Sequence, residues 1–256
     1  MADKLFYTVI VTSLLIAIII VYFVISILRF HRRYIRLQKE RIHAEITMQE
    51  MERKRIANDL HDSLGPLLST AKLYIHSITV SGEEDKQLLD RAGAYIDETI
   101  TGLREISYNL LPGSLSRNGL TDALKEYINR LNTARVINIE LVIDEPISVA
   151  KENEVHLFRI IQEIIHNTVK HAKAANLQLR FTGEEGNQLL IITDDGVGFD
   201  PAGIKRSGGL GLKSIESRCE MLNASMQLSS AKGKGCKYVI KFSKMLDSEQ
   251  NTLTLT

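Results

Sequence analysis

The apolar positions of this chain change their spacing along its length, and each change predicts a different kind of structure. Residues 5–28 form an uninterrupted apolar stretch without a charged residue. Between residues 29 and 111, apolar residues recur every three or four positions, which is the period of an amphipathic helix. From about Asn118 onward, similar helical patterns alternate with short stretches that read as strands. The pattern therefore predicts one apolar helix, then a helical region, then an α/β region.

The apolar stretch at residues 5–28 has the length and the flanking charges of a membrane anchor. As a helix it would span roughly 36 Å, against about 30 Å for the hydrocarbon core of a bilayer. A cleaved signal peptide has a shorter apolar stretch and basic residues before it, whereas here Arg29, Arg32, Arg33 and Arg36 come after it. The positive-inside rule then puts residues 1–4 outside and everything after the anchor in the cytoplasm. We therefore expect a single-pass transmembrane helix and no extracytoplasmic sensor domain.

Residues 29–52 predict a helix that continues from the anchor, because they contain no Gly or Pro and are rich in helix formers. Apolar residues fall on alternating steps of three and four; Arg41 interrupts this seam, and Arg55 interrupts it just after this range. The seam residues are Tyr34, Leu37, Ala44, Met48 and Met51. We expect a signalling helix paired with a second copy, and the alternative is a charged helix lying on the inner leaflet.

Residues 53–113 predict a helical hairpin. The first apolar stripe consists of Ile56, Leu60, Leu64, Leu67, Ala71, Tyr74 and Ile78. The second stripe consists of Leu88 or Leu89, Ala92, Ile96, Ile100, Leu103, Ile106 and Leu110. A loop around residues 81–85 separates them, and Pro112-Gly113 ends the second helix. Two such helices cannot bury their stripes alone, so we expect two hairpins to form a dimeric four-helix bundle.

The stretch "RIANDLHDSLGPLLSTAKLYI" in the first of these helices carries a His-Asp pair and a proline. His61 lies at the edge of the apolar stripe, where its ring can reach solvent. Pro66 removes the helical hydrogen bond to the Asp62 carbonyl, so we expect a kink one turn past the histidine. A lone histidine at a helix edge is most often an ordinary surface residue, so this feature gains meaning only from the domain that follows.

Residues 118–244 predict a two-layer sandwich of a mixed or antiparallel sheet with helices on one face. The expected helices cover residues 120–132, 153–174 and 211–222. The expected strands cover residues 136–143, 177–183, 188–196, 225–231 and 237–243. The tail after this region, residues 245–256, is expected to be disordered.

Three polar clusters lie on this predicted domain. Glu163, Asn167 and the pair Lys170-His171 share one helix face, which offers hard oxygen ligands for Mg²⁺ and positive charge for a triphosphate. In "IITDDGVGFD", Asp194 ends a buried strand, where a carboxylate can accept a hydrogen bond from an exocyclic amine.

Glycines belong to the second cluster and make up the third. Gly196 and Gly198 follow the aspartates and let backbone approach a flat base. In "SGGLGLKSI", Gly208, Gly209 and Gly211 precede a helix whose N-terminal N–H groups favour phosphate. Each cluster alone is a weak signal, but the three in this order on one two-layer domain are specific.

Composition excludes some other functions. The formal net charge of +1 gives no electrostatic support to nucleic-acid binding. Cys219 and Cys236 are the only cysteines, too few for a disulfide framework or a thiolate metal site, so we expect both to be buried apolar residues.

The clusters resemble a known family. "EIIHNTVKH" resembles the N box, "DDGVG" the G1 box and "GGLGL" the G2 box of the Bergerat-fold (GHKL) ATPases. "ERKRIANDLHDSLG" resembles the phosphoacceptor motif of sensor histidine kinases, in the subfamily in which aspartate follows the histidine. "GSLSRNGLTDAL" is also similar to that subfamily, which signals to helix-turn-helix (LuxR/NarL-type) response regulators. The resemblance covers roughly residues 52–243.

The resemblance implies a role for each matching residue. His61 would accept the γ-phosphoryl group of ATP, and Asp62 would orient the imidazole or accept its proton. Asn167 would bind Mg²⁺ with Glu163 beside it, acting through water. The residues implied to bind the nucleotide are Asn167, Lys170, His171, Asp194, Gly196, Gly198, Gly209, Leu210, Gly211 and Leu212. A short lid is implied at about residues 200–208.

These implications combine into one functional hypothesis. We expect a homodimeric protein-histidine kinase, anchored in the bacterial cytoplasmic membrane, that uses ATP and Mg²⁺ and passes its phosphoryl group to an aspartate of a response regulator. The alternatives are a Bergerat-fold serine kinase, which would lack the helical hairpin, and an inactive signalling scaffold. The subfamily typically has glutamine five residues after the histidine, where this chain has Pro66, so we expect weak phosphatase activity.

Overall fold

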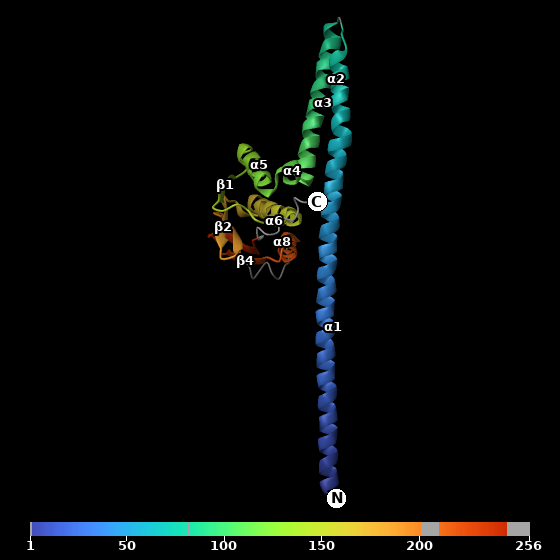
Figure 1. The fold of residues 1–256 in the computed structure, drawn as a ribbon, viewed down its shortest axis with the longest axis vertical. Coiled ribbons are helices and arrows are strands. Elements are labelled where there is room, and N and C mark those ends of the chain that lie inside the picture. The colour runs from blue at the N-terminus through green and yellow to red at the C-terminus, as the bar shows by residue number, and fades with distance from the viewer. Residues whose placement is uncertain (1, 81, 201–209, 245–256) are drawn as a thin grey trace, which may run out of the picture. The chain divides into compact units, whose positions relative to one another are not determined.

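The computed structural model describes residues 2–80, 82–200 and 210–244 (Figure 1). The chain divides into two compact units, Met1–Met48 and Gln49–Thr256. The helix α1, Ala2–Asp59, forms the described part of the first unit and continues into the second. The prediction of one continuous helix through the linker is therefore confirmed.

One helical stretch among the described residues, Ser13–Ser77, includes a window long and apolar enough to cross a membrane. That window lies near the N-terminus and none of it is buried within the chain. Length and composition alone do not establish insertion into a membrane, so the membrane crossing stays a prediction.

The helix changes its hydrogen-bonding pattern next to Pro66. A π-helical turn, η1, covers Leu60–Leu64, and the α-helical pattern resumes as α2, Gly65–Ser77. The Gly65 N–H donates to the Leu60 carbonyl, five residues back. Proline has no N–H and its ring crowds the carbonyl four residues earlier, so the preceding turn widens. The sequence predicts a kink one turn past His61, whereas the structure has the irregular turn at Leu60–Leu64, which contains His61.

The hairpin is completed by α3, Glu83–Leu110, which packs against α2. Lys72 Nζ lies 2.6 Å from Asp97 Oδ1 across the hairpin. The predicted stripe is only partly covered, since the side chains of Leu67 and Tyr74 remain 66% and 70% exposed. The described residues of one chain therefore leave an apolar surface of the hairpin uncovered.

A short helix that the sequence analysis missed, α4, Gly113–Asn118, follows the hairpin directly. It leads through Gly119, whose φ of 84° favours glycine, into α5, Leu120–Thr133. Leu115 of α4 is only 4% exposed and joins the core of the α/β region. A helix of six residues is too short to show a helical period in the sequence, which explains the miss.

The α/β region contains a five-stranded mixed sheet in the order β1-β2-β3-β5-β4. The strands are β1, Asn138–Ile143; β2, Asn176–Glu184; β3, Asn187–Asp194; β4, Ser225–Ser230; and β5, Cys236–Ser243. β1 and β2 are parallel, and the other neighbours are antiparallel. The expected strands and the mixed sheet are confirmed.

Helices cover one face of this sheet (Figure 1). In β2, Leu177, Leu179 and Phe181 are buried and their neighbours are not, so only one face carries the core. The covering helices are α5, α6 (Glu154–Asn167) and α8 (Leu210–Met221), and a 3-10 turn, η2, Lys151–Asn153, precedes α6. The predicted two-layer arrangement is therefore present.

The central helix α6 is almost fully buried along one side, where the side chains of its Leu, Phe and Ile residues are at most 1% exposed. These are Leu157, Phe158, Ile160, Ile161, Ile164 and Ile165. After Asn167 the helix widens into a second π turn, η3, Thr168–Ala172, and Lys173 follows with a φ of 51°. The predicted helix at residues 153–174 is thus an α-helix that ends in a π turn.

Candidate functional site

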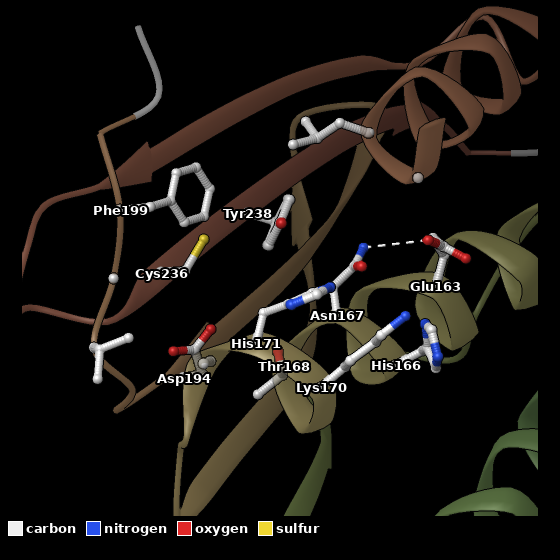
Figure 2. A pocket seen from close by; sticks show the side chains of 15 residues that line it. Glu163, His166, Asn167, Thr168, Lys170, His171, Asp194, Phe199, Cys236 and Tyr238 are labelled. Carbon is white, nitrogen blue, oxygen red and sulfur yellow. Dashed lines mark hydrogen bonds between the residues drawn. The ribbon is translucent and has the colours of Figure 1, made fainter. Parts of the chain in front are cut away.

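A cavity of about 550 Å³ opens beside the end of α6 (Figure 2). Its walls come from α6, η3, the loop after β3, the start of α8 and the start of β5. The lining residues are Glu163, His166, Asn167, Thr168, Lys170, His171, Ala172, Asp194, Val197, Gly198, Phe199, Gly211, Leu212, Cys236 and Tyr238. Segments that are distant in the sequence therefore meet at this one cavity.

The predicted cluster on α6 and η3 lines one wall of the cavity. Asn167 Nδ2 lies 3.3 Å from Glu163 Oε1, to which it donates a hydrogen bond (Figure 2). This bond turns the amide nitrogen toward Glu163, so the amide oxygen faces away from the carboxylate. Lys170 and His171 follow on the π turn. Oxygen atoms able to bind a metal ion and the side chains of Lys170 and His171 thus lie on the same wall.

Asp194 lines the cavity from the end of β3. It is 6% exposed, and its Oδ1 accepts a hydrogen bond from the Gly196 N–H at 2.9 Å. Burial raises the pKa of Asp194, while hydrogen bonds from the N–H groups of Gly196 and Cys236 and from the Thr168 hydroxyl act in the opposite direction. The carboxylate is therefore fixed in place at an otherwise apolar part of the cavity.

The neighbouring Asp195 has a different environment. Its Oδ1 accepts hydrogen bonds from the backbone N–H groups of Ala175 at 2.8 Å and Asn176 at 3.0 Å. The Asn176 side-chain amide donates to its other oxygen at 2.8 Å. These bonds lower the pKa of Asp195, and the residue does not line the cavity. Asp195 therefore fastens the end of β3 to the start of β2.

The glycines after β3 allow close backbone packing. A Cβ at Gly196 would lie 2.7 Å from the Cβ of Ala172, so a side chain there would displace the π turn. Gly198 has a φ of 59°, and a Cβ would collide with the Ala231 carbonyl. Gly198 lines the cavity, whereas Gly196 does not.

The other predicted nucleotide residues lie on or next to α8. Gly211 and Leu212 line the cavity, and a Cβ on Gly211 would meet the Glu163 carboxylate. Leu210 begins α8. The expected lid and Gly209 lie outside the described residues, apart from Asp200.

His61 and Asp62, the predicted catalytic pair, lie in η1 on the hairpin, and both are exposed. Neither lines the cavity, and no described residue of the hairpin does. The structure therefore brings the predicted binding residues together but leaves the predicted phosphoacceptor apart from them within one chain.

Several cavity residues were missed from the sequence, including Thr168, Phe199, Cys236 and Tyr238. Cys236 lies opposite Asp194 in the antiparallel pairing of β3 and β5, and only this pairing brings it to the site. Burial raises the pKa of Cys236 to about 11. The prediction that both cysteines are buried is confirmed, since Cys219 and Cys236 are free and buried. Thr168 and Phe199 had a local signal, because they directly follow Asn167 and Gly198 in the quoted motifs.

The contrast between the two aspartates predicts opposite effects of pH on stability. The pKa of Asp195 is depressed in the folded state, so its contribution is present above its unfolded value of about 3.9 and is lost as pH falls through the folded pKa. We expect Asp195→Asn to lower the melting temperature at pH 7, with a difference from wild type that shrinks below about pH 4.

Asp194→Asn is the matched comparison for this measurement. The pKa of Asp194 is raised in the folded state, so its ionised form opposes folding as pH rises. We therefore expect Asp194→Asn to melt at pH 7 no lower than wild type, as followed by circular dichroism. A larger loss of melting temperature in Asp194→Asn than in Asp195→Asn would contradict the assignment of the structural role to Asp195.

Two family models match this chain. Residues 52–115 match the family described as "Histidine kinase". Residues 152–245 match "Histidine kinase-, DNA gyrase B-, and HSP90-like ATPase". The first match contains His61, and the second contains the residues that line the cavity.

Two curated relatives of this chain are described as histidine kinases. An uncharacterized sensor-like histidine kinase of Chloroflexus aurantiacus is 32% identical over 222 residues, which cover 79% of this chain and 36% of the relative. The oxygen sensor histidine kinase NreB of Staphylococcus carnosus is 27% identical over 202 residues, which cover 77% of this chain and 58% of the relative. The chain thus spans less than two thirds of the length of either relative.

Solved structures include the histidine kinase domain of a blue-light activated histidine kinase from Erythrobacter litoralis EL346. It is 18% identical, with a TM-score of 0.48, and the match covers 80% of this chain and 96% of that one. This likeness is too distant to carry an argument about function. The two family matches show that the chain contains a region of the histidine kinase family, which includes the hairpin, followed by a region of the histidine kinase-, DNA gyrase B-, and HSP90-like ATPase family, which includes the cavity.

Proposed function

We propose that the chain binds ATP in the cavity beside α6, transfers the γ-phosphoryl group to His61, and passes it on to an aspartate of a response regulator. The observation that carries the proposal is the meeting of Asn167, Glu163 and Asp194 at one cavity, on a chain whose exposed His61 lies in the matched histidine kinase region. By resemblance, the regulator would have a receiver domain and a helix-turn-helix output.

Asp194 is suited to recognise the adenine base. Its carboxylate is buried and held by the Gly196 N–H, so it can accept a hydrogen bond from the exocyclic amine without rearranging. Apolar side chains that line the same cavity, such as Phe199 and Leu212, can pack against a flat ring. The proposal assigns base recognition to this end of the cavity.

The triphosphate would lie toward Lys170, His171 and the start of α8. A cationic side chain and the positive end of a helix both favour phosphate. Gly209, Leu210 and Gly211 belong to this part of the proposal by resemblance. In-line phosphoryl transfer depends mostly on positioning and neutralisation of charge, which such groups provide.

The donors on α6 fit Mg²⁺. No group of three His, Cys, Asp or Glu residues able to hold a metal ion occurs among the described residues. Mg²⁺ commonly binds through one or two protein oxygens together with phosphate oxygens and water. Asn167 Oδ1 would hold the ion with Glu163 beside it, and the ion would neutralise charge on the phosphates.

His61 is suited to be the nucleophile because it is exposed and can meet both the cavity and a receiver domain. One ring nitrogen would bond to the γ-phosphorus while the bond between that phosphorus and the β–γ bridging oxygen breaks, which releases ADP. Asp62 would accept the hydrogen bond of the other ring nitrogen and help to remove its proton.

The exposed apolar surface of the hairpin supports a homodimer. Leu67, Tyr74 and Leu88 are each more than 60% exposed, so the described residues of one chain leave these side chains of the helix pair uncovered. A second hairpin would bury them in a four-helix bundle. We further propose that residues 5–28 anchor this dimer in the cytoplasmic membrane with the catalytic part inside.

The first functional prediction concerns His61. Residues 29–256 should incorporate ³²P from Mg²⁺-ATP as an acid-labile, base-stable label. His61→Gln should abolish the label, because glutamine has no nucleophilic nitrogen, while ATP binding measured by calorimetry stays within about twofold of wild type. Persistent labelling of His61→Gln would remove this residue from the mechanism.

The second prediction concerns binding at the cavity. Asn167→Asp places another negative charge beside Glu163 and the triphosphate, and Asp194→Asn replaces the acceptor for the base. We expect each change to weaken ATP binding about tenfold or more, the equivalent of a charged hydrogen bond of about 1.5–3 kcal/mol.

Asp195→Asn is the matched control for this series, because Asp195 does not line the cavity. It should keep near-normal ATP affinity despite its lower melting temperature. If Asp194→Asn and Asp195→Asn lost affinity equally, base recognition by Asp194 would be ruled out.

The third prediction concerns the phosphatase reaction. Pro66 and Gly65 offer no polar side chain near His61 to hold a hydrolytic water. We expect the chain with ADP to accelerate decay of its phosphorylated regulator only slightly, and Pro66→Gln to raise that rate while autophosphorylation survives. The measurement is loss of ³²P from the purified regulator, and a strong acceleration by the wild-type chain would refute the prediction.

A further inference from the structure

A buried cluster of three charges lies away from the cavity, and the proposed chemistry does not use it. Glu50 of α1 is 9% exposed, although both of its neighbours in the sequence are exposed. Its Oε2 lies 3.1 Å from Nε of Arg159 on α6, and its Oε1 lies 2.8 Å from Nη2 of Arg218 on α8. The arginines are 4% and 6% exposed. The cluster therefore joins α1 to the two helices that bound the cavity.

Arg159 also holds the end of the hairpin. Its Nη1 lies 3.4 Å from the Asn109 carbonyl oxygen, and its Nη2 donates to the Leu110 carbonyl. The last carbonyls of a helix have no partner within it and attract cations. A single guanidinium thus links α1, the C-terminus of α3 and α6, next to the Pro112-Gly113 connection between the hairpin and the α/β region.

The cluster fixes where the cavity lies relative to the hairpin. Arg159 comes about one helical turn before Glu163, and Arg218 about two turns after Gly211, so both arginines belong to the rigid helices that carry cavity residues. Glu50 lies about three turns before His61 on the same continuous helix. With these contacts in place, no described hairpin residue lines the cavity, so the chain's own His61 is not at the nucleotide site.

The charged side chains of Glu50, Arg159 and Arg218 form a contact that can break reversibly. Two guanidinium groups share one carboxylate, and burial lowers the pKa of Arg159 while Glu50 opposes that effect. The desolvation free energy of the buried charges offsets most of their electrostatic attraction. Such a cluster therefore fixes the relative position of the three helices more than it stabilises the fold. When the contact opens, all three side chains regain water. A small rotation or shift of α1 would carry Glu50 away from both arginines.

We propose that Glu50, Arg159 and Arg218 form an autoinhibitory latch, which holds the nucleotide-binding region in a docked state and restrains phosphorylation of His61 until α1 moves. The latch rests on the proposed function, because it regulates that reaction. Its input is the position of α1, the helix that contains the predicted membrane anchor.

The test compares Glu50→Gln with Glu45→Gln in the full chain reconstituted in lipid nanodiscs. Glu45 lies on the same helix and is exposed, so its substitution controls for loss of one carboxylate from α1. We expect Glu50→Gln to raise the initial rate of ³²P incorporation at saturating ATP by about 5- to 100-fold, the range of a typical coupling between sites, with unchanged ATP affinity. Glu45→Gln should label at the wild-type rate.

A second variant that breaks the same contact shows whether a changed rate comes from the contact or from a local folding defect at Glu50. Arg218→Gln should raise the rate in the same direction, and the double variant should label no faster than the faster single variant, because both changes break one contact. Hydrogen exchange without ATP should show faster exchange of the amides at residues 109–115 in both single variants, since Arg159 no longer holds the end of α3 as firmly.

The outcomes separate the latch from the function on which it rests. If the wild type is labelled but Glu50→Gln and Arg218→Gln incorporate ³²P no faster, or more slowly, the latch alone is overturned. Unchanged exchange at residues 109–115 would also overturn it. Absence of label from every variant and the wild type would refute the proposed function, and with it the inhibitory role of the latch.

Discussion

The packing of α6 against the sheet is the interaction on which the rest of the α/β region depends. Its buried side places six large apolar side chains in the core, where each is at most 1% exposed. That burial fixes the rotation of the helix, and the rotation decides where the other side points. Glu163 and Asn167 then face the cavity, and Arg159 on the same helix faces the end of the hairpin. One hydrophobic contact surface therefore sets both the proposed site and its connection to the hairpin.

Two π turns occur where the proposed chemistry occurs. One contains His61 and Asp62, and the other contains Lys170 and His171. A π turn widens the helix and rotates the following side chains relative to a regular α-helix, and such turns are frequent at functional sites. Near His61 the cause is Pro66, which cannot donate the regular hydrogen bond. At the end of α6, the widened turn is followed by Lys173 in the left-handed region, and its last residue, Ala172, accepts a hydrogen bond from the Val197 N–H at 2.8 Å.

The separation of His61 from the cavity gives the connection between the hairpin and the α/β region a functional meaning. The proposed phosphoryl transfer requires the nucleotide and the histidine to meet, so the α/β region proposed to bind the nucleotide would have to change its position relative to a histidine. In the docked arrangement, Arg159 contacts α1 and the last carbonyls of α3 together. A contact built from charges can release without exposing a large apolar surface, which makes repeated opening physically reasonable.

The sequence by itself determined the elements and much of the candidate site. The strands, the helices α5 and α8, and the shared helix face of Glu163 and Asn167 followed from local periodicity, because these depend on residues close in the chain. The placement of Asp194 at the same site was implied only by the family resemblance of the short motifs. The sequence did not reveal Cys236 beside Asp194, since that contact requires the pairing of β3 with β5. It did not reveal Glu50 either, because 109 residues separate it from Arg159 and no local pattern marks a charge for burial. Tertiary structure decided these features because strand pairing and burial depend on residues brought together only when the chain folds.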